Sequence, residues 1–311
     1  MEIVRYADPA DRAIHTGVLT DGQVTPLPVP DLADLWSRPR AEIRSITTEA
    51  TAPDRPVDDL LLLPPIDGAT ELWAAGVTYA RSRDAREEES VLAAAYGLVY
   101  EAARPEIFFK SVAWRVVTDL EPVGIRRDSP LNVPEAELAL VINADGEIVG
   151  YAVCNDMSSR SIEGANPLYL PQAKVYAGAC ALGAGIRPAW EVPDPGNLDI
   201  ELTVVRQGAT AWEGVTNTSA MCRGLEELAS CLFAEQAFPA GAVLTTGTGL
   251  VPEMEFALRT DDVIHIAIEG IGTLANPVVA GKDSFAWLER SVSDPFARIP
   301  ARPIPHRNGG S

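Results

Sequence analysis

The order of apolar and polar residues predicts a small mixed unit at the start of the chain. Residues 3–6 and 14–19 alternate between the two kinds, as strands with one buried face do. Asp21 and Gly22 follow the second run as a two-residue turn, and residues 31–36 have the length of a short helix. We therefore expect a small α/β unit in this part of the chain.

A polar segment with two prolines, residues 48–57, indicates a linker to a larger unit. The last residues contain three prolines and end in Gly-Gly-Ser, which is typical of a frayed tail. We accordingly expect an N-terminal domain (residues 1–65), a larger domain (66–296) and a tail (297–311).

The pattern predicts mostly strands in the larger domain, together with two helices. Polar residues followed by apolar residues at helical spacing predict an amphipathic helix over residues 79–102. A second helix is expected over residues 222–233, with Thr218 or Ser219 as its N-terminal cap. Apolar runs predict strands over residues 107–109, 137–143, 148–154, 198–206 and 263–268.

Composition and charge exclude several classes of protein. With 311 residues, of which 47% are apolar and 22% charged, the chain can bury a substantial core. Its net charge of −19 leaves no excess of basic residues to neutralise phosphates, so we expect no nucleic-acid partner. No run of 18 apolar residues occurs and no apolar leader precedes Asp8, so we expect no membrane association and a cytoplasmic location.

The most informative segment combines two glutamates with an apolar strand. Glu135 and Glu137 are separated by one residue, and on a strand such side chains point to the same face. The positions that follow, 138–142, are all apolar, so the strand enters a core, where two like charges repel each other and lose hydration. A divalent cation would remove both costs. Alternatively, the two glutamates face solvent at the end of a strand.

A third carboxylate favours the metal site. Asp145 and Gly146 form a hairpin turn, after which a second apolar run leads to Asp156. A hairpin of this length returns Asp156 to the start of the first strand, beside Glu135 and Glu137. Three carboxylates, with the remaining positions left to water or substrate, are typical of Mg²⁺, and the all-oxygen donor set also admits Ca²⁺ or Mn²⁺.

These residues and four further motifs resemble the fumarylacetoacetate hydrolase family. The metal signature of that family corresponds here to Glu135, Glu137 and Asp156. The further motifs follow in the order of the family, and the resemblance covers roughly residues 70–280. They are Gly-x-x-Tyr at 76–79, Phe-x-Lys at 108–110, a lysine about twenty residues after the aspartate (Lys174), and Thr-Gly-Thr-Gly at 246–249.

The resemblance implies a fold and a substrate class. The implied fold class is α+β, with a small N-terminal α/β unit and a mixed, mostly-β roll around the metal, usually paired as a homodimer. Residues 104–110 and 156–176 are more narrowly similar to the 2-keto-3-deoxy sugar-acid dehydratases of the family, typified by the 2-dehydro-3-deoxy-D-arabinonate dehydratase. The partner implied is a small-molecule 2-oxo acid substrate.

Two positions depart from the family pattern. Its hydrolases carry a histidine soon after the Gly-x-x-Tyr motif, whereas residues 80–83 contain none, so hydrolysis assisted by that histidine is not expected. Ala165 stands where the dehydratase branch usually has glutamate. If that glutamate handles a hydroxyl or a proton of the substrate, the sugar-acid assignment is weakened.

The implied chemistry begins with a 2-oxo acid that chelates the metal, which stabilises the enolate formed when C3 loses a proton. If C4 bears a hydroxyl, the enolate expels it, and a proton shift through C5 yields a 2,5-dioxopentanoate. We therefore expect a magnesium-dependent hydro-lyase. The alternatives are C–C hydrolysis of acylpyruvates, decarboxylation or tautomerisation by the same enolate chemistry, and an inactive member that only binds a metabolite.

Six further residues are candidates for the reaction. The resemblance implies that Lys174 carries a proton or holds the enolate oxygen, and that Glu163 acts as a base or binds substrate. Each has a structural alternative, since Lys174 could pair with the carboxylates and Glu163 could support a neighbouring group. The expected substrate-binding residues are Thr248 in the glycine turn, Lys110, which could instead support the site from behind, and Arg81 and Ser82 in the segment that the family uses as a lid.

Overall fold

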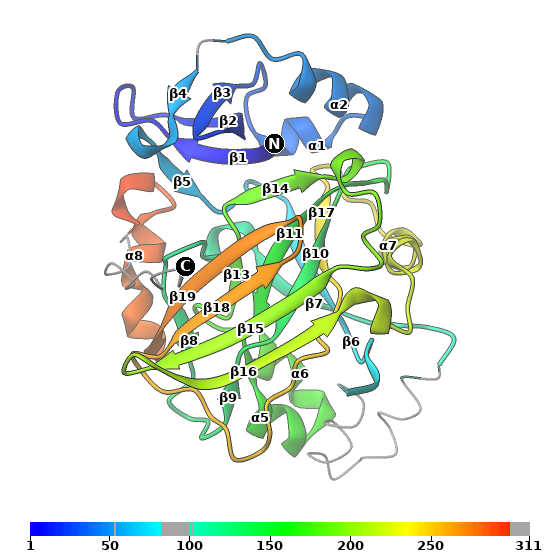
Figure 1. Cartoon of the computed structure of the whole chain (residues 1–311), viewed down its shortest axis with the longest axis vertical. Coiled ribbons are helices and arrows are strands. Elements are labelled where there is room, and N and C mark those ends of the chain that lie inside the picture. Colours follow the sequence, from blue (N-terminus) through cyan, green and yellow to red (C-terminus); the bar gives the residue numbers. More distant parts are fainter. Residues whose placement is uncertain (53, 82–99, 101, 299–311) are drawn as a thin grey trace, which may run out of the picture.

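Three antiparallel strands open the chain in the computed structural model, which describes residues 1–52, 54–81, 100 and 102–298 (Figure 1). The strands β1 (Glu2–Ala7) and β2 (Ile14–Thr20) confirm the two predicted runs, and β3 (Gln23–Pro26) extends them. Asp21 and Gly22 have φ values of 49° and 75°. A two-residue hairpin turn that matches the twist of its strands requires these two positive values, so the Asp-Gly pair sets the turn.

Two helices follow β3. Helix α1 (Leu32–Trp36) confirms the prediction over residues 31–36, and the side chain of Asp31 caps it by accepting from the N–H of Asp34. Helix α2 (Arg40–Thr48) was not predicted. Only Ile43 and Thr47 are buried along it, so its apolar stripe is too sparse to stand out in the sequence.

One continuous sheet runs from these first strands into the larger part of the molecule. The short strand β4 (Arg55–Pro56) pairs with β3, and β5 (Leu61–Leu63) pairs with β1. Strand β1 also pairs with β14 (Gly185–Pro188), with Ile3 opposite Ile186. The start of the chain is therefore joined to the larger part by strand pairing as well as by the backbone.

The same sheet continues through the strands that carry the candidate site. The predicted hairpin is formed by β10 (Ala136–Ile142) and β11 (Ile148–Asp156), in which every residue is buried. Beyond β10 the sheet adds β17 (Ala242–Thr245), β6 (Glu71–Gly76) and β7 (Glu106–Val112), while β13 (Cys180–Leu182) pairs with β11. Complete burial indicates that both faces of the hairpin are covered.

A second sheet of five strands covers one face of this hairpin (Figure 1). The core between the two sheets contains Leu138 and Val153 from the hairpin and Ile200 and Ile266 from the second sheet. The predicted strands over residues 198–206 and 263–268 are confirmed here. In spatial order the strands are β16 (Ala209–Asn217), β15 (Asp199–Arg206), β18 (Val263–Ile268), β19 (Gly272–Ala280) and β8 (Val123–Ile125).

The first two helices cover the opposite face of the hairpin. Val141 of β10 and Val149 of β11 share a hydrophobic cluster with Leu35 and Trp36 of α1 and with Ile43 of α2. Two layers of apolar side chains therefore hold the hairpin rigidly between the second sheet and the N-terminal helices. The fold is α+β and mostly strand, as predicted.

The remaining helices are short. Helices α5 (Arg160–Ala165) and α6 (Leu170–Lys174) follow β11 and the two-residue strand β12 (Ser158–Ser159), which pairs with β9 (Asn132–Val133). Helix α8 (Ala286–Arg290) follows the second sheet. In the part of the chain that the structure describes, no helix has the length and apolarity needed to cross a bilayer.

Helix α7 (Leu225–Phe233) confirms the helix predicted over residues 222–233, but its predicted cap is wrong. The cap is Gly224, whose N–H donates to the Glu227 carboxylate at 3.2 Å. Thr218 and Ser219 lie in a separate 3-10 turn, where the side chain of Asn217 accepts from the N–H of Ser219. The predicted hydroxyl residues lie a few positions before the helix begins. The Glu227 side chain, which reaches back to the N–H of Gly224, takes over the capping role instead.

Three other predictions fall partly or wholly outside the described residues. The helix expected over residues 79–102 lies outside them except near its two ends, and Ser82 also lies outside them. The expected tail is described only as far as Arg298, whose guanidinium donates to both carboxylate oxygens of Glu121, at 2.6 and 2.8 Å.

Candidate metal centre and active site

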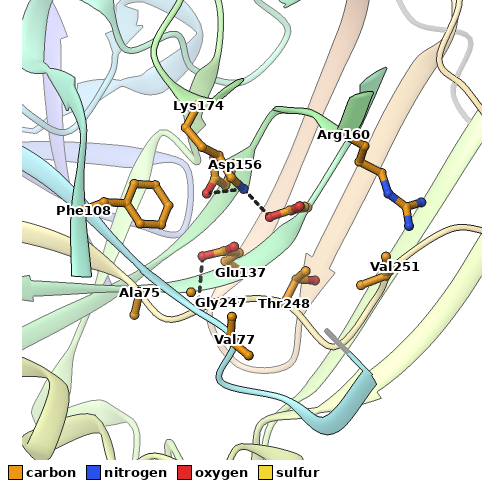
Figure 2. Close-up of a pocket in the computed structure, with 12 residues that line it drawn as sticks. Ala75, Val77, Phe108, Glu137, Asp156, Arg160, Lys174, Gly247, Thr248 and Val251 are labelled. Carbon is orange, nitrogen blue, oxygen red and sulfur yellow. Dashed lines mark hydrogen bonds and ion pairs between the residues drawn. The ribbon is translucent and has the colours of Figure 1, made fainter. Parts of the chain in front are cut away.

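The β10–β11 hairpin brings three carboxylates together. In its register Ala136 lies opposite Asn155, and the N–H of Asp156 donates to the carbonyl of Glu135 at 2.9 Å. One carboxylate oxygen from each of Glu135, Glu137 and Asp156 lies within 4.8 Å of the others. The predicted convergence across one hairpin is confirmed, and Figure 2 shows Glu137 and Asp156 at one cavity.

All three acidic side chains are buried. Glu135 is 7% exposed, and Glu137 and Asp156 are each 1% exposed. The alternative of two glutamates in solvent at a strand end is therefore wrong. Buried carboxylates need partners, since an isolated charge loses its hydration without compensation.

Lys174, at the end of α6, supplies part of that compensation. Its ammonium contacts Oδ2 of Asp156 at 3.3 Å (Figure 2). It also contacts Oε2 of Glu135 at 2.7 Å and donates to the hydroxyl of Ser158 at 2.5 Å. The ammonium also lies 5.8 Å from the ring centre of Phe108. Lys174 therefore pairs with the carboxylates, as its structural alternative predicted. The same contacts place the ammonium at the cavity, where it could also transfer a proton.

Glu137 is held on its other side by the Thr-Gly-Thr-Gly turn. The Thr245 hydroxyl and the Gly247 N–H, the latter at 2.8 Å, both donate to Oε2 of Glu137. Gly247 has a φ of 85°, and a Cβ there would overlap with the Thr78 hydroxyl, so the position requires glycine. The turn therefore contributes a backbone donor to one of the metal-ligand candidates.

The electrostatics of the site favour a cation. Burial, followed by the charges of Asp156 and Glu135, raises the pKa of Glu137 to about 8. Lys174 and Lys110 are the two lysines in contact with the three carboxylates, so full ionisation of this group leaves one negative charge uncompensated. An all-oxygen donor set with excess negative charge fits Mg²⁺, Ca²⁺ or Mn²⁺.

Lys110 lies behind the metal-ligand candidates. Its ammonium pairs with Oδ1 of Asp156 and donates to the carbonyls of Met157 and Lys174, at 3.0 and 2.6 Å. The side chain is 1% exposed, and Lys110 is not among the described residues that line the cavity. The structure therefore places this predicted substrate-binding residue in contact with Asp156 and outside the described cavity wall.

A cavity opens beside the triad (Figure 2). Thr248 lines it, as the resemblance implies, while its hydroxyl also accepts from the N–H of Leu250 at 3.0 Å. Besides the triad, Lys174 and Thr248, its described walls are formed by Ala75, Gly76, Val77, Phe108, Arg160, Gly247 and Val251. Val77 has a φ of 54°, which is strained for a β-branched residue and is seen most often at functional sites.

Arg160 was not predicted. It begins α5, is 3% exposed and lines the cavity, with its guanidinium donating to the carbonyl of Pro252. Figure 2 shows Arg160 across the cavity from Lys174. The signal was present in the sequence, because Arg160 follows Asp156 by four residues in the same motif block.

A further carboxylate lies beside the cavity wall. Glu106 is the first residue of β7 and faces the cavity-wall residue Gly76 across the β6–β7 pairing, where a Cβ on Gly76 would overlap with the Glu106 carboxylate. Strand alternation places Glu106 and Phe108 on one face, and the register of the pairing shifts beyond Phe109. Since Phe108 lines the cavity, the period of two could have pointed to Glu106 as well.

The other described residues that were predicted are not part of the described cavity wall. Glu163 is 1% exposed on α5 and is not among the described residues that line the cavity. The guanidinium of Arg81 donates to the carbonyl of Val251, a cavity-wall residue, at 3.4 Å. Ala165, the departure from the dehydratase pattern, is exposed and is also absent from the described cavity wall.

Comparisons with known proteins agree with this geometry. Residues 73–279 match the family described as "Fumarylacetoacetate (FAA) hydrolase C-terminal". The chain is 47% identical over 252 residues to a probable 2-keto-3-deoxyxylonate dehydratase of Haloferax volcanii, covering 80% of this chain and 86% of the relative. It is 42% identical over 226 residues to the 2-dehydro-3-deoxy-D-arabinonate dehydratase of Saccharolobus solfataricus, covering 71% and 76%.

A comparison with a solved structure agrees with these sequence matches. That structure is described as 2-keto-3-deoxy-D-arabinonate dehydratase complexed with magnesium and 2,5-dioxopentanoate, and it superposes with a TM-score of 0.78 at 33% identity. The alignment covers 91% of this chain and all of that one. The chain belongs to the fumarylacetoacetate hydrolase family.

Proposed function

We propose that the protein is a magnesium-dependent dehydratase of a 2-keto-3-deoxy sugar acid, with a 2,5-dioxopentanoate as its product. The observation that carries the proposal is the buried triad of Glu135, Glu137 and Asp156 beside Lys174, in a chain 47% identical to a probable dehydratase of this class. The relative of solved structure binds magnesium and 2,5-dioxopentanoate according to its description.

Charge at the site fits an anionic substrate. Three carboxylates and two ammonium groups carry one net negative charge when all are ionised. A bound divalent cation makes this group positive by one charge, which one carboxylate of a 2-oxo acid neutralises. When bound, the cation also supplies a Lewis acid that draws electrons from the keto group of such a substrate.

The reaction requires proton transfers that the residues of the chain can perform. Loss of a proton from C3 and of hydroxide from C4 releases water and leaves a C3–C4 double bond. A proton then moves from C5 to C3, and the resulting enol at C5 becomes the aldehyde when C4 takes up the hydroxyl proton. Lys174, whose ammonium lies at the cavity beside the triad, is our candidate for the transfer at C3.

The opposite part of the cavity offers groups that could orient the substrate. Thr248 presents a hydroxyl, and the Arg160 guanidinium presents donors that suit a hydroxyl or carboxylate oxygen. Roles for Glu163 and Arg81 in the reaction, and for Ser82, remain predictions. The exposed position of Ala165 weakens the argument against a sugar-acid substrate, because the substituted side chain is outside the described cavity wall.

A product assay tests this function. We would incubate the purified protein and Mg²⁺ with 2-keto-3-deoxypentonates, oxaloacetate and an acylpyruvate, and identify the products by mass spectrometry. The proposal predicts a 2,5-dioxopentanoate from the pentonate, with the reaction stopped by EDTA. Pyruvate with CO₂ or with a carboxylic acid, from the other two substrates alone, would instead support decarboxylation or C–C hydrolysis, and metal binding without any product would support an inactive member.

We also propose that the protein acts as a homodimer in the cytoplasm. Leu168, 83% exposed, and Val215, 65% exposed on the edge strand β16, are apolar side chains that a second copy could cover. Light scattering during size-exclusion chromatography tests the dimer, and a monomer at micromolar concentration would contradict it. Cell fractionation tests the location.

A further inference from the structure

The ammonium group of Lys110 is shielded from solvent and contacts three oxygen atoms. It comes from the middle of β7, and its side chain is fully buried. One acceptor is the Asp156 carboxylate, and the other two are the carbonyls of Met157 and Lys174, at 3.0 and 2.6 Å. Two protons of the ammonium are donated to backbone carbonyls and its charge pairs with a buried carboxylate, so the position of the group is fixed by three contacts.

The three oxygen atoms belong to two parts of the site, the end of β11 and the end of α6. Asp156 is a metal-ligand candidate at the end of β11, and Met157 follows it. The Lys174 carbonyl lies at the end of α6, whose last side chain is the proton-transfer candidate. One ammonium on β7 therefore ties the metal-binding strand to the backbone that carries Lys174.

The two buried lysines differ in the kind of acceptor that they contact. The Lys174 ammonium contacts the side chains of Glu135, Asp156 and Ser158. Lys110 makes two of its three contacts to backbone carbonyls, whose position does not depend on side-chain rotation. Lys110 is therefore anchored to the backbone on both sides of its ion pair with Asp156.

We propose that Lys110 is a positioning residue, which orients Asp156 toward the cation and fixes the distance between Asp156 and the backbone of Lys174. The proposal replaces a role for Lys110 in substrate binding, since its ammonium is committed to Asp156 and two carbonyls and the residue is not in the described cavity wall. It rests on the proposed function only in taking Asp156 as a metal ligand.

Lys110→Met tests the proposal, because methionine has similar length and no protons to donate. Supporting groups behind metal ligands typically contribute 10- to 100-fold to metal affinity or activity. We expect Lys110→Met to weaken Mg²⁺ binding at least tenfold in calorimetry and to lower kcat at least tenfold, with a smaller change in KM. Lys282→Met, at the exposed third lysine of the chain, is the matched control and should match the wild type in each measurement.

Folding and positioning are separated by measuring Mg²⁺ affinity well below the unfolding temperature of each variant. A purely structural role would lower that temperature and leave the Mg²⁺ affinity and kcat of the folded protein unchanged, and this result would overturn the proposal. If Lys110→Met does not fold, Lys110→Arg decides. Its planar guanidinium cannot direct three protons from one atom, so we expect at least a fivefold loss in kcat, and wild-type kcat and Mg²⁺ affinity would overturn the proposal.

The Mg²⁺ titration needs no substrate, so its outcome is independent of the product assay. If no sugar acid is dehydrated but Lys110→Met loses Mg²⁺ affinity, the proposed function fails and the positioning role stands. If the dehydratase activity is present and Lys110→Met binds Mg²⁺ and turns over like the wild type, only the positioning role fails.

Discussion

Glu137 carries the clearest electrostatic signature of the site, and its pKa leads to a test by pH. The pKa is raised from its ordinary value of 4.5 to about 8, mainly by burial. Below pH 4.5 this group therefore adds stability to the chelator-treated protein, and that stability is lost as the pH rises through 8. A cation that pairs with the ionised carboxylate offsets the loss.

We expect the Mg²⁺-induced increase in unfolding temperature to be larger at pH 8.5 than at pH 6. Differential scanning fluorimetry with EDTA or with saturating Mg²⁺ at both pH values measures it. Glu137→Gln should remove the difference between the two pH values. An equal shift at pH 6 and pH 8.5 in the wild type would contradict the assignment of Glu137 as a metal ligand.

Gly76 allows the space beside Glu106 to be tested without changing a charge. A Cβ at Gly76 would overlap with the Glu106 carboxylate, and the backbone there is not left-handed, so Gly76→Ala acts through space alone. We expect a folded protein whose kcat/KM falls at least tenfold, since displaced groups at a reaction site are costly. Gly196→Ala, where the nearest atom is 3.5 Å away, is the control and should retain wild-type kinetics.

Sequence reasoning at this scale succeeded where spacing along one strand or hairpin settled the answer. The triad is such a case, because the hairpin turn at Asp145 fixed which residues return to Glu135. The family motif predicted that Lys110 belongs to the site. Whether it faces the cavity or lies outside its wall depends on the carbonyls of Met157 and Lys174, to which it donates. Those carbonyls lie 47 and 64 residues away along the chain, and no local sequence pattern predicts these contacts.

Among the elements, the β10–β11 hairpin determines the geometry of the triad. Its turn lies at the opposite end of the hairpin from Asp156, and Gly146 in that turn has a φ of 79°. Gly146→Ala should lower the free energy of unfolding by about 1–2 kcal/mol, because alanine resists this backbone conformation. Mg²⁺ affinity should not change, since the long strand pairing and both covering layers keep the register.

Chemical denaturation and calorimetry together measure this prediction. Gly208→Ala, at a φ of 80° with no neighbour within 4 Å, is the matched control for the backbone cost alone. A tenfold loss of Mg²⁺ affinity in Gly146→Ala would show that the turn, and not the strand register, positions the carboxylates.

Elements were predictable where burial leaves a clear period. The strands β15 and β18 alternate regularly in burial and were located to within a residue or two. Helix α2 was missed because few of its side chains are buried, and the cap of α7 was misplaced because a glutamate that reaches back replaces a hydroxyl. The wide apolar stripe that predictions rely on is absent in the first case, and the usual capping residue is absent in the second.

At the scale of the whole molecule, strand pairing between distant segments is what the sequence could not predict. The pairing of β1 with β14 joins Ile3 to Ile186, and the parallel pairing of β17 with β6 joins Ala242 to Glu71. These pairings join segments that are far apart in the sequence and have no signature within either strand. The mostly-β α+β class and the buried acidic triad, by contrast, followed from alternation, turn chemistry and the family resemblance.

The most direct test of the account is a calorimetric titration of the chelator-treated protein with Mg²⁺ at pH 8, beside Glu137→Gln and Asp156→Asn. Three buried carboxylates that share one cation predict a single site per chain in the wild type and at least a hundredfold loss of affinity in each variant. A wild-type protein that binds no divalent ion, or variants that bind it with unchanged affinity, would contradict the account.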